Sequence, residues 1–324
     1  MARTIVGVLR GGTSSEYDLS LKTGAAMMNA LEPEQYEVRD IFIDKNGFWN
    51  VRGAPSTPAR ALSQIDVVLN ALHGGVGEDG TVQRLLQRSG VPFAGSAAVS
   101  SCLALNKIRA REVLQNAGIR MPRATSFTLG DKLTTAAMAR QAFEQFAAPY
   151  VVKPPSEGAS HGILVAANLH ALPNAIGDTL DRFGSALVEE YIRGKHASVG
   201  VIEHFRNQEL YALPPALVML PDGAQMLESA HHRSGMLEHA VPSDFSFDQK
   251  KTLMDMARAA HRALGLAHFS RADFIVAPRA IYLLEVNTTP GLYPGASFPP
   301  MLEAVGSSVH QFVEHMIALA RGAI

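Results

Sequence analysis

Four polar residues stand at matching positions in two apolar runs near the end of the chain. Arg271 and Asp273 are two residues apart in the first run, and Glu285 and Asn287 are two apart in the second. Side chains two residues apart on a strand point to the same side, so a hairpin of the two runs would set Asp273 across from Glu285 and Asn287. Two carboxylates and an amide suit Mg²⁺, which fills its remaining positions with waters and phosphate oxygens. Arg271, on the same face, could neutralise a phosphate or a developing oxyanion.

The alternative for this hairpin is a solvated face with ordinary salt bridges. The neighbouring residues are apolar, and carboxylates buried among apolar side chains need a partner. Those neighbours are Phe274, Ile275, Val276, Leu283 and Leu284. We therefore predict a metal site formed by Asp273, Glu285 and Asn287.

Two lysines stand where they could contact phosphates. Lys107 opens an expected helix over 106–117, and Lys153 ends an expected strand over 150–153. A lysine ammonium acts as a compact point charge on nucleotide phosphates, although each lysine taken alone fits an ordinary surface position. The loop 154–162 is rich in small residues and could cover phosphates with its backbone N–H groups and the Ser160 hydroxyl. It is not a Walker A loop, because the GxxxxGK[ST] pattern is absent from the chain.

Two glycine-rich turns, at 11–16 and 73–80, follow expected strands at 4–9 and 66–72. In α/β sheets, ligands bind at the carboxyl ends of parallel strands. Glu16 could there hold an ammonium group, and His73 could contact a carboxylate or phosphate. The alternative is a pair of structural glycine turns with a helix cap and a core histidine.

The remaining pattern alternates strands and helices, which predicts an α/β fold with a parallel N-terminal sheet. Further helices are expected over 20–31, 81–88 (closed by Gly90), 135–146 (capped by Thr134), 248–264 and 307–320. Further strands are expected over 163–166, 186–192, 197–203, 210–218, 272–277 and 281–287.

The composition excludes several classes of function. The chain has 324 residues, enough for two or three domains, and its 29 Lys and Arg against 30 Asp and Glu leave a net charge of −1. This balance predicts no nonspecific binding to nucleic acid. The single cysteine excludes an internal disulfide, and the start of the chain lacks the apolar stretch of a signal peptide. No apolar run approaches the length of a membrane span, so we expect a cytoplasmic protein with no membrane partner.

Taken together, these motifs resemble the D-alanine–D-alanine ligases of the ATP-grasp superfamily. The matching segments keep the family's order and spacing; they are 11–16, 20–22, 71–74, 77–81, 106–107, 152–154, 157–158 and 285–291. The resemblance implies a three-domain α/β (α+β) chain with the ATP-grasp fold. Its parts would be an N-terminal substrate domain with a parallel sheet (1–97), a central ATP-grasp subdomain (98–192), and a C-terminal ATP-grasp subdomain with the metal site and a lid loop (193–324).

The resemblance also implies the reaction and the nucleotide site. Members of the family join two D-alanines through a D-alanyl phosphate, with ATP and two Mg²⁺ (or Mn²⁺), for peptidoglycan precursor synthesis. Lys107 and Lys153 would contact the phosphates, and Asp273, Glu285 and Asn287 would hold the metal ions. The adenosine would be bound by Glu189, Glu190, Ile192 and His196.

For the amino acids, the resemblance implies Glu16 at the amino group of the first D-alanine and His73 near its carboxylate. Arg271 would stabilise the oxyanion, and Gly291 and Ser297 would bind the substrate, Ser297 by anchoring the acceptor carboxylate. The loops that close the site would contribute Ser160, His231 and His232. The family commonly forms homodimers through the N-terminal domain, so the expected partners are small amino acids and a second copy of the chain.

Three positions depart from the family pattern. The family usually has two serines where this chain has Ala159-Ser160, an Ala-Lys-Tyr run where it has Ala230-His231-His232, and a ribose-binding glutamate where it has His196. These departures leave the acceptor open, and a histidine lid could make acceptor choice depend on pH. Three functions remain: ligation of two D-alanines, ligation to a different amino or hydroxy acid, and nucleotide binding without catalysis. The complete set of metal ligands argues against the last.

Overall fold

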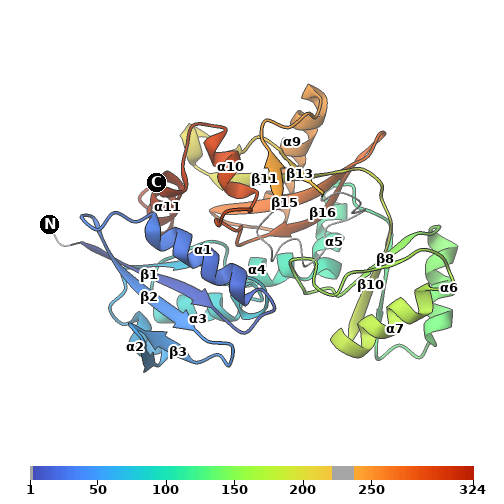
Figure 1. Ribbon diagram of the computed structural model, residues 1–324, viewed down its shortest axis with the longest axis horizontal. Coiled ribbons are helices and arrows are strands. Elements are labelled where there is room, and N and C mark those ends of the chain that lie inside the picture. The colour runs from blue at the N-terminus through green and yellow to red at the C-terminus, as the bar shows by residue number, and fades with distance from the viewer. Residues whose placement is uncertain (1–2, 221–236) are drawn as a thin grey trace.

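The computed structural model describes residues 3–220 and 237–324, and three sheets follow one another along that part of the chain (Figure 1). The first sheet has the strand order β4-β3-β2-β1-β5-β6, with parallel pairing from β2 to β6. Its strands are β1 (Thr4–Gly11), β2 (Tyr36–Ile43), β3 (Trp49–Val51), β4 (Ala54–Ser56), β5 (Val67–Asn70) and β6 (Phe93–Ala94). Its helices are α1 (Tyr17–Asn29), α2 (Pro58–Leu62), the 3₁₀ turn η1 (Gly75–Gly77) and α3 (Thr81–Ser89). The expected parallel α/β sheet is confirmed.

The sequence of strand β1 places a glycine turn at the carboxyl edge of this sheet. Val6, Val8 and Leu9 are fully buried, as the centre of a parallel sheet requires. The strand ends at Gly11, where φ is +93° and a Cβ atom would lie 2.1 Å from the carbonyl oxygen of Ile43. Only glycine fits there. The chain therefore leaves the sheet at its carboxyl edge.

The second sheet is antiparallel, in the order β7-β10-β8-β9. Its strands are β7 (Ala124–Thr128), β8 (Tyr150–Lys153), β9 (Leu164–Ala166) and β10 (Ser185–Glu190). Helices α6 (Thr135–Gln145) and α7 (Leu172–Phe183) cover this sheet, whereas α4 (Ala98–Leu105) and α5 (Lys107–Asn116) pack into the core of the third sheet. The expected strand over 150–153 and its hairpin partner are confirmed, and Thr134 caps α6 by accepting from Ala137 N. The sequence did not predict α4, α7, β2 or β7.

The third sheet has the order β14-β13-β11-β15-β16, with β12 also paired to β11. Its strands are β11 (Lys195–Glu203), β12 (Leu210–Ala212), β13 (Ala216–Met219), β14 (Glu238–Ala240), β15 (Phe269–Val276) and β16 (Ile281–Asn287). The single strand expected over 210–218 was wrong. Pro214 and Pro215 divide it, because proline has no N–H to give to a sheet ladder, and both halves pair separately with β11.

Helix α11 (Val309–Ala320) returns the chain to the first sheet, where it packs against β5 and β6 (Figure 1). Helix α9 (Phe247–Ala263) packs on the third sheet, α10 (Phe298–Glu303) lies between β11 and α11, and the short η2 turn (Phe205–Asn207) follows β11. The ring of Phe312 packs 4.9 Å from Phe298 and 5.5 Å from Phe269, and this cluster also includes Val6 and Val67 of the first sheet. One apolar core therefore spans the first and third sheets. Among the described residues, no helix is long and apolar enough to cross a membrane.

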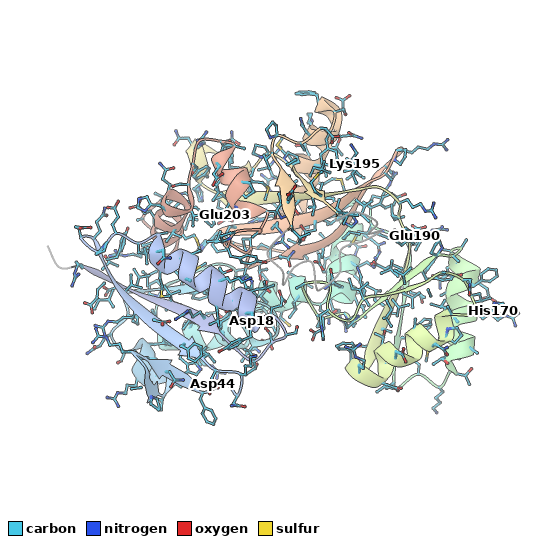
Figure 2. All side chains as sticks on the ribbon, in the orientation of Figure 1. Asp18, Asp44, His170, Glu190, Lys195 and Glu203 are labelled. Atoms are coloured by element: carbon cyan, nitrogen blue, oxygen red, sulfur yellow. The ribbon has the colours of Figure 1, made fainter. Side chains whose placement is uncertain are left out.

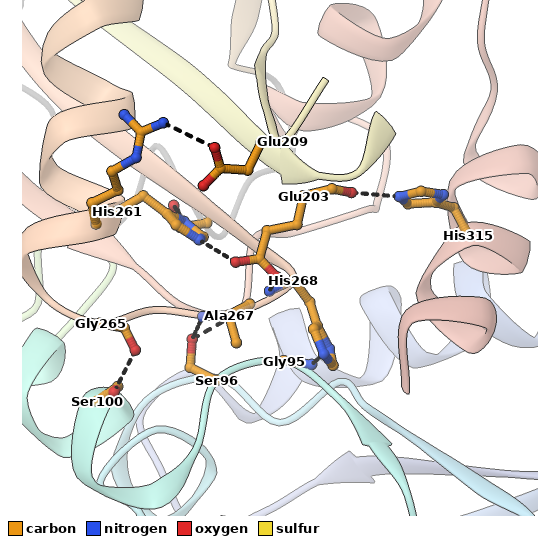
Figure 3. Close-up of polar contacts among 12 residues, drawn as sticks. Gly95, Ser96, Ser100, Glu203, Glu209, His261, Gly265, Ala267, His268 and His315 are labelled. Carbon is orange, nitrogen blue, oxygen red and sulfur yellow. Dashed lines mark hydrogen bonds and ion pairs between the residues drawn. The ribbon is translucent and has the colours of Figure 1, made fainter. Parts of the chain in front are cut away.

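Polar contacts fix the same junction (Figure 3). The backbone of His268 has φ of +68°, and its N–H donates to Glu203 Oε2 at 2.7 Å. Its ring Nδ1 accepts from the backbone N–H of Gly95 at 3.0 Å. Nearby, Ser100 Oγ of α4 donates to the carbonyl of Gly265, just before β15, at 2.6 Å. The first and third sheets are thus joined by directional bonds as well as by apolar packing.

We expect Phe312→Ala to destabilise the protein by about 3–5 kcal/mol, because it opens a cavity in the core shared by the two sheets. Thermal unfolding followed by circular dichroism should show a lower Tm. Phe143→Ala, at a half-exposed ring, is the matched control. Equal Tm values for the two variants would contradict this account of the core.

Candidate active site

A cleft is lined by strands of the second and third sheets and by helix α1 and the turns that follow β1 and β5 of the first sheet. It encloses about 1540 Å³ of space not filled by atoms, its open mouth included. Every described residue predicted to form the site lines it: Glu16, His73, Lys107, Lys153, Ser160, Glu189, Glu190, Ile192, His196, Arg271, Asp273, Glu285, Asn287, Gly291 and Ser297. His231 and His232 lie outside the described residues. Figure 2 shows Glu190 on the side of the second sheet that faces the third, whereas His170 lies at its outer end.

The polar hairpin has the register that the sequence predicts. Asp273 of β15 pairs with Glu285 of β16, and Arg271 pairs with Asn287. The Asp273 carboxylate accepts from Arg271 NH2 at 2.8 Å, from Asn287 Nδ2 at 2.8 Å and from Ser198 Oγ at 2.7 Å. Four chemistry-bearing side chains are therefore collected on one face of two rigid strands.

This donor set fits a hard divalent cation. Asp273 and Glu285 supply carboxylate oxygens and Asn287 an amide oxygen, the ligands that Mg²⁺ prefers. The Asp273 and Glu285 side chains are 20% and 27% exposed, so both face the cleft. Among residues 3–220 and 237–324, no group of three or more His, Cys, Asp or Glu side chains is placed to bind a metal. The predicted site has two carboxylates, and the Asn287 amide completes its set of ligands.

The charges of this face are mutually stabilised. Burial by itself raises the pKa of Glu285, but Lys107, Lys153 and Arg271 more than reverse it and hold the pKa well below the ordinary value. Burial likewise opposes the charge of Arg271, yet Asp273 and Glu285 raise the pKa of its guanidinium. Both groups stay charged throughout the physiological range.

The two lysines are buried, so the surface alternative for them is wrong. Lys107 Nζ lies 3.0 Å from Glu285 Oε2 and donates to the carbonyl of Glu157 at 2.6 Å. Lys153 Nζ lies 2.7 Å from Glu189 Oε2, and the Lys153 residue is 5% exposed. Burial opposes the charge of Lys107, but Glu285 raises its pKa overall. Both lysine side chains thus lie at the cleft, each beside a glutamate.

Glu16 lies between two glycines. A Cβ at Gly158 would come within 2.3 Å of Glu16 Oε1, and one at Gly74 within 2.6 Å. Burial raises the pKa of Glu16 to about 8, with Glu78 and Glu285 adding to the rise and Lys107 and Arg271 opposing it. A ligand ammonium group placed here would restore the charged carboxylate.

His73 faces the same end of the cleft from the turn after β5. Its Nε2 lies 2.7 Å from Thr23 Oγ1 in a buried hydrogen bond. Burial, and secondarily the charge of Arg271, lower the pKa of His73 to about 4. The ring is therefore neutral at pH 7 and can contact a ligand only as a dipole.

Loop 154–162 closes over Glu16 from the second sheet. The backbone N–H of Lys107 donates to the carbonyl of Pro155 at 2.8 Å, and Ser15 Oγ donates to Glu157 Oε2 at 3.1 Å. Ala159 and Ser160 both have positive φ, +45° and +56°. The loop is held in this unusual backbone conformation by contacts to helix α5 and to the turn after β1.

The far end of the cleft lies beside strand β10. The Glu190 carboxylate accepts from Arg123 N at 2.8 Å and Arg123 Nε at 2.9 Å, so its oxygens face that arginine. His196 lies on β11 opposite Val218, and burial lowers its pKa. The side chains of this wall are neutral or already paired, which suits an apolar ring system.

Two residues of the cleft were missed at the sequence level. Glu78 accepts from Gly74 N (2.8 Å), Thr288 Oγ1 (2.9 Å), Thr288 N (3.2 Å) and Thr289 N (3.1 Å). It therefore joins the turn that carries His73 to the segment that follows Asn287. Its place in Gly77-Glu78-Asp79-Gly80 was the one available signal.

Tyr293 is the other missed residue. Its ring is buried against Leu19 and Ala296, and Ala159 of the loop packs on the same cluster. A Cβ at Gly291 would lie 2.6 Å from this ring, so the glycine allows the ring to sit against the backbone. An aromatic residue two positions after Gly291 was the available signal.

Comparisons of sequence agree over the whole chain. Residues 5–96 match the family described as D-ala D-ala ligase N-terminus, and residues 113–318 match D-ala D-ala ligase C-terminus. The D-alanine–D-alanine ligase of Desulforudis audaxviator is 34% identical over 317 residues, covering 98% of each chain. That of Geotalea uraniireducens is 33% identical over 316 residues, covering 97% of this chain and 95% of its own.

Solved structures share the fold. They include a D-alanine–D-alanine ligase from Coxiella burnetii (TM-score 0.86, 22% identical, covering 100% of this chain and 95% of that one). The VanG D-Ala:D-Ser ligase of Enterococcus faecalis gives a TM-score of 0.85 at 24% identity, covering 98% of this chain and 100% of that one. A Bacillus anthracis D-alanine–D-alanine ligase complexed with ATP gives 0.81 at 24% identity, covering 99% and 98%.

The solved structures confirm the fold that the family resemblance implied, the ATP-grasp fold. The chain belongs to the D-alanine–D-alanine ligase family, whose members are ATP-dependent carboxylate–amine ligases.

We expect Glu78→Ala to lower the Tm, since each buried donor left without its acceptor costs about 1–3 kcal/mol. Differential scanning calorimetry would measure the change, with the exposed Glu34→Ala as control. If both variants unfold at the same temperature, Glu78 does not join these segments as described.

Proposed function

We propose that this protein joins two D-alanines to D-alanyl-D-alanine at the expense of ATP, through a D-alanyl phosphate, for peptidoglycan precursor synthesis. The observation that carries the proposal is one cleft lined both by Glu16 and by Arg271, Asp273, Glu285 and Asn287. An amine-binding group and a phosphoryl-transfer face in one cleft suit a carboxylate–amine ligase. Family membership over the whole chain supports the same activity.

In this proposal ATP occupies the end of the cleft beside β10. Lys107 and Lys153 would contact its phosphates as buried point charges. Glu189, Glu190, Ile192 and His196 would surround the adenosine.

Asp273, Glu285 and Asn287 would hold two Mg²⁺, for which Mn²⁺ could substitute. When bound, the metal neutralises charge on the transferring phosphoryl group. The chain's own part is to keep both carboxylates ionised, which the low pKa of Glu285 ensures for that residue.

The substrate end follows from the charges around Glu16. Glu16 would pair with the ammonium of the first D-alanine, and neutral His73 would lie near its carboxylate. That carboxylate attacks the γ-phosphorus and ADP leaves, which gives an acyl phosphate. The amine of the second D-alanine then attacks the acyl carbon, and inorganic phosphate leaves from a tetrahedral intermediate.

Arg271 would stabilise the oxyanion of that intermediate from its place beside Asp273. Gly291 and Ser297 would bind the second D-alanine. The loop with Ser160 would exclude water, since water would hydrolyse the acyl phosphate. The roles given to His231 and His232 remain predictions.

The proposal also covers the organisation of the chain. Each sheet lies inside one of the proposed domains 1–97, 98–192 and 193–324, which supports those boundaries. A homodimer through the N-terminal domain and a cytoplasmic location are proposed from the family resemblance.

The direct test is phosphate release with ATP, Mg²⁺ and D-alanine alone, with the product identified by mass. We expect release and the D-alanyl-D-alanine mass, and a loss of at least about 100-fold in kcat for Asp273→Asn. Asp244→Asn, at an exposed ion pair, is the matched control. Release that requires a second amino or hydroxy acid would instead show a different acceptor, and no release with any acceptor would contradict the proposal.

Binding of D-alanine should release a proton. The pKa of Glu16 is about 8 in the free protein, so at pH 7 the group is mostly protonated and must ionise to pair with an ammonium. Affinity should therefore rise about tenfold per pH unit from pH 6 to 7 and level off above pH 8.

Calorimetric titration of D-alanine in two buffers of different ionisation enthalpy, with ADP present, measures this proton. We expect about one proton released per D-alanine at pH 7. Glu16→Gln should abolish the release and the exposed Glu34→Gln should keep it. A binding enthalpy independent of buffer would show that Glu16 is already ionised or is not the amine site.

A further inference from the structure

Five charged side chains of both signs lie at and directly behind the wall of the cleft. They form the row Arg111, Glu189, Lys153, Glu285 and Lys107. Glu189 Oε1 accepts from Arg111 NH2, and its Oε2 lies 2.7 Å from Lys153 Nζ. Lys107 Nζ lies 3.0 Å from Glu285 Oε2, and this pair lines the same cleft as Lys153. Glu189 therefore stands between two cations.

Helix α5 supplies both ends of the row. Lys107 and Arg111 are four residues apart, on the same face of the helix. Lys107 lines the cleft, whereas Arg111 does not belong to its lining among the described residues. Arg111 therefore acts on the cleft only through what it touches.

Arg111 is buried at some cost. The residue is 8% exposed, its NH1 donates to the carbonyl of Pro122 at 2.5 Å, and its Nε has no hydrogen-bond partner in the described part of the chain. An incompletely bonded guanidinium is expensive to bury unless a carboxylate offsets it. Glu189, itself 3% exposed, is that carboxylate.

The net charge of the row depends on Arg111. With Arg111, three cations face two carboxylates, so the row keeps one positive charge in excess. Without Arg111, the Lys153–Glu189 and Lys107–Glu285 pairs would cancel. The excess charge lies where the proposed ligand has its phosphates.

We propose that Arg111 is a positioning residue for nucleotide binding: it neutralises Glu189 and so leaves the charge of Lys153 available to the phosphates. The proposal rests on ATP being the ligand of this end of the cleft. Lys153 keeps two of its three N–H donors for the ligand, and Arg111 sets how strongly they attract it.

The test compares adenosine with ADP, without Mg²⁺ and without amino acids, by calorimetric titration. The ratio of the adenosine Kd to the ADP Kd isolates the contribution of the phosphates. We expect Arg111→Gln to lower this ratio about tenfold and Glu189→Gln to raise it. The double variant R111Q/E189Q should return the ratio close to that of the unaltered protein, because the excess of one charge is restored.

The same-helix variant Arg109→Gln, at an exposed arginine paired with Glu112, is the matched control and should leave the ratio unchanged. If R111Q does not fold, Arg111→Lys and Glu189→Gln decide: R111K should keep the ratio within about threefold and E189Q should raise it. An equal loss of adenosine and ADP affinity in R111Q, or no recovery in the double variant, would overturn the inference. Failure of the unaltered protein to bind ADP would contradict the proposed function instead.

Discussion

The site depends on one constraint: a charge buried in this cleft must face an opposite charge. The Lys107–Glu285 pair meets it between helix α5 and strand β16. The same ammonium binds the carbonyl of Glu157, so one side chain ties the third sheet, helix α5 and loop 154–162 together. The Arg271–Asp273 pair meets the constraint within β15. Because the Lys107–Glu285 pair crosses between elements, it fixes the geometry of the cleft as well as its charge.

Glu16 is the instructive exception. It is enclosed by Gly74 and Gly158, and its neighbours Glu78 and Glu285 are themselves acidic, so burial favours the protonated form. A site that keeps an acid neutral until a cation arrives selects for an ammonium group. Glu78 is also buried nearby, but its oxygens already accept hydrogen bonds from backbone N–H groups and a threonine hydroxyl. It therefore does not offer its carboxylate to a ligand. The two glutamates of this cleft therefore differ in role: Glu78 joins two segments of the chain, whereas Glu16 is the one proposed to bind a ligand.

How much the sequence could predict follows from the range of each interaction. The register of Asp273 against Glu285 was predictable because a strand has a period of two and the hairpin is local. The bond between Glu78 and Thr288 joins residues 210 positions apart, and no local pattern encodes it. Arg111 has an ordinary place in an amphipathic helix, and its partner Glu189 lies 78 positions away. The split of 210–218 was readable from Pro214 and Pro215, but the apolar residues on both sides of the prolines read as one continuous run.

The two ends of the cleft are built on different physics, and this decides where the chain can vary. At the end beside β10, where we propose that the nucleotide binds, ion pairs hold Lys153, Glu189 and Glu190 in place, so changing one charge unbalances the row. At the other end, the ring of Tyr293 packs on Ala159, Leu19 and Ala296, and apolar packing tolerates substitution if volume is kept. A serine at position 159 would set its hydroxyl against that ring. The alanine that departs from the family pattern is therefore consistent with Tyr293, and the pair together shapes the space left for the second substrate.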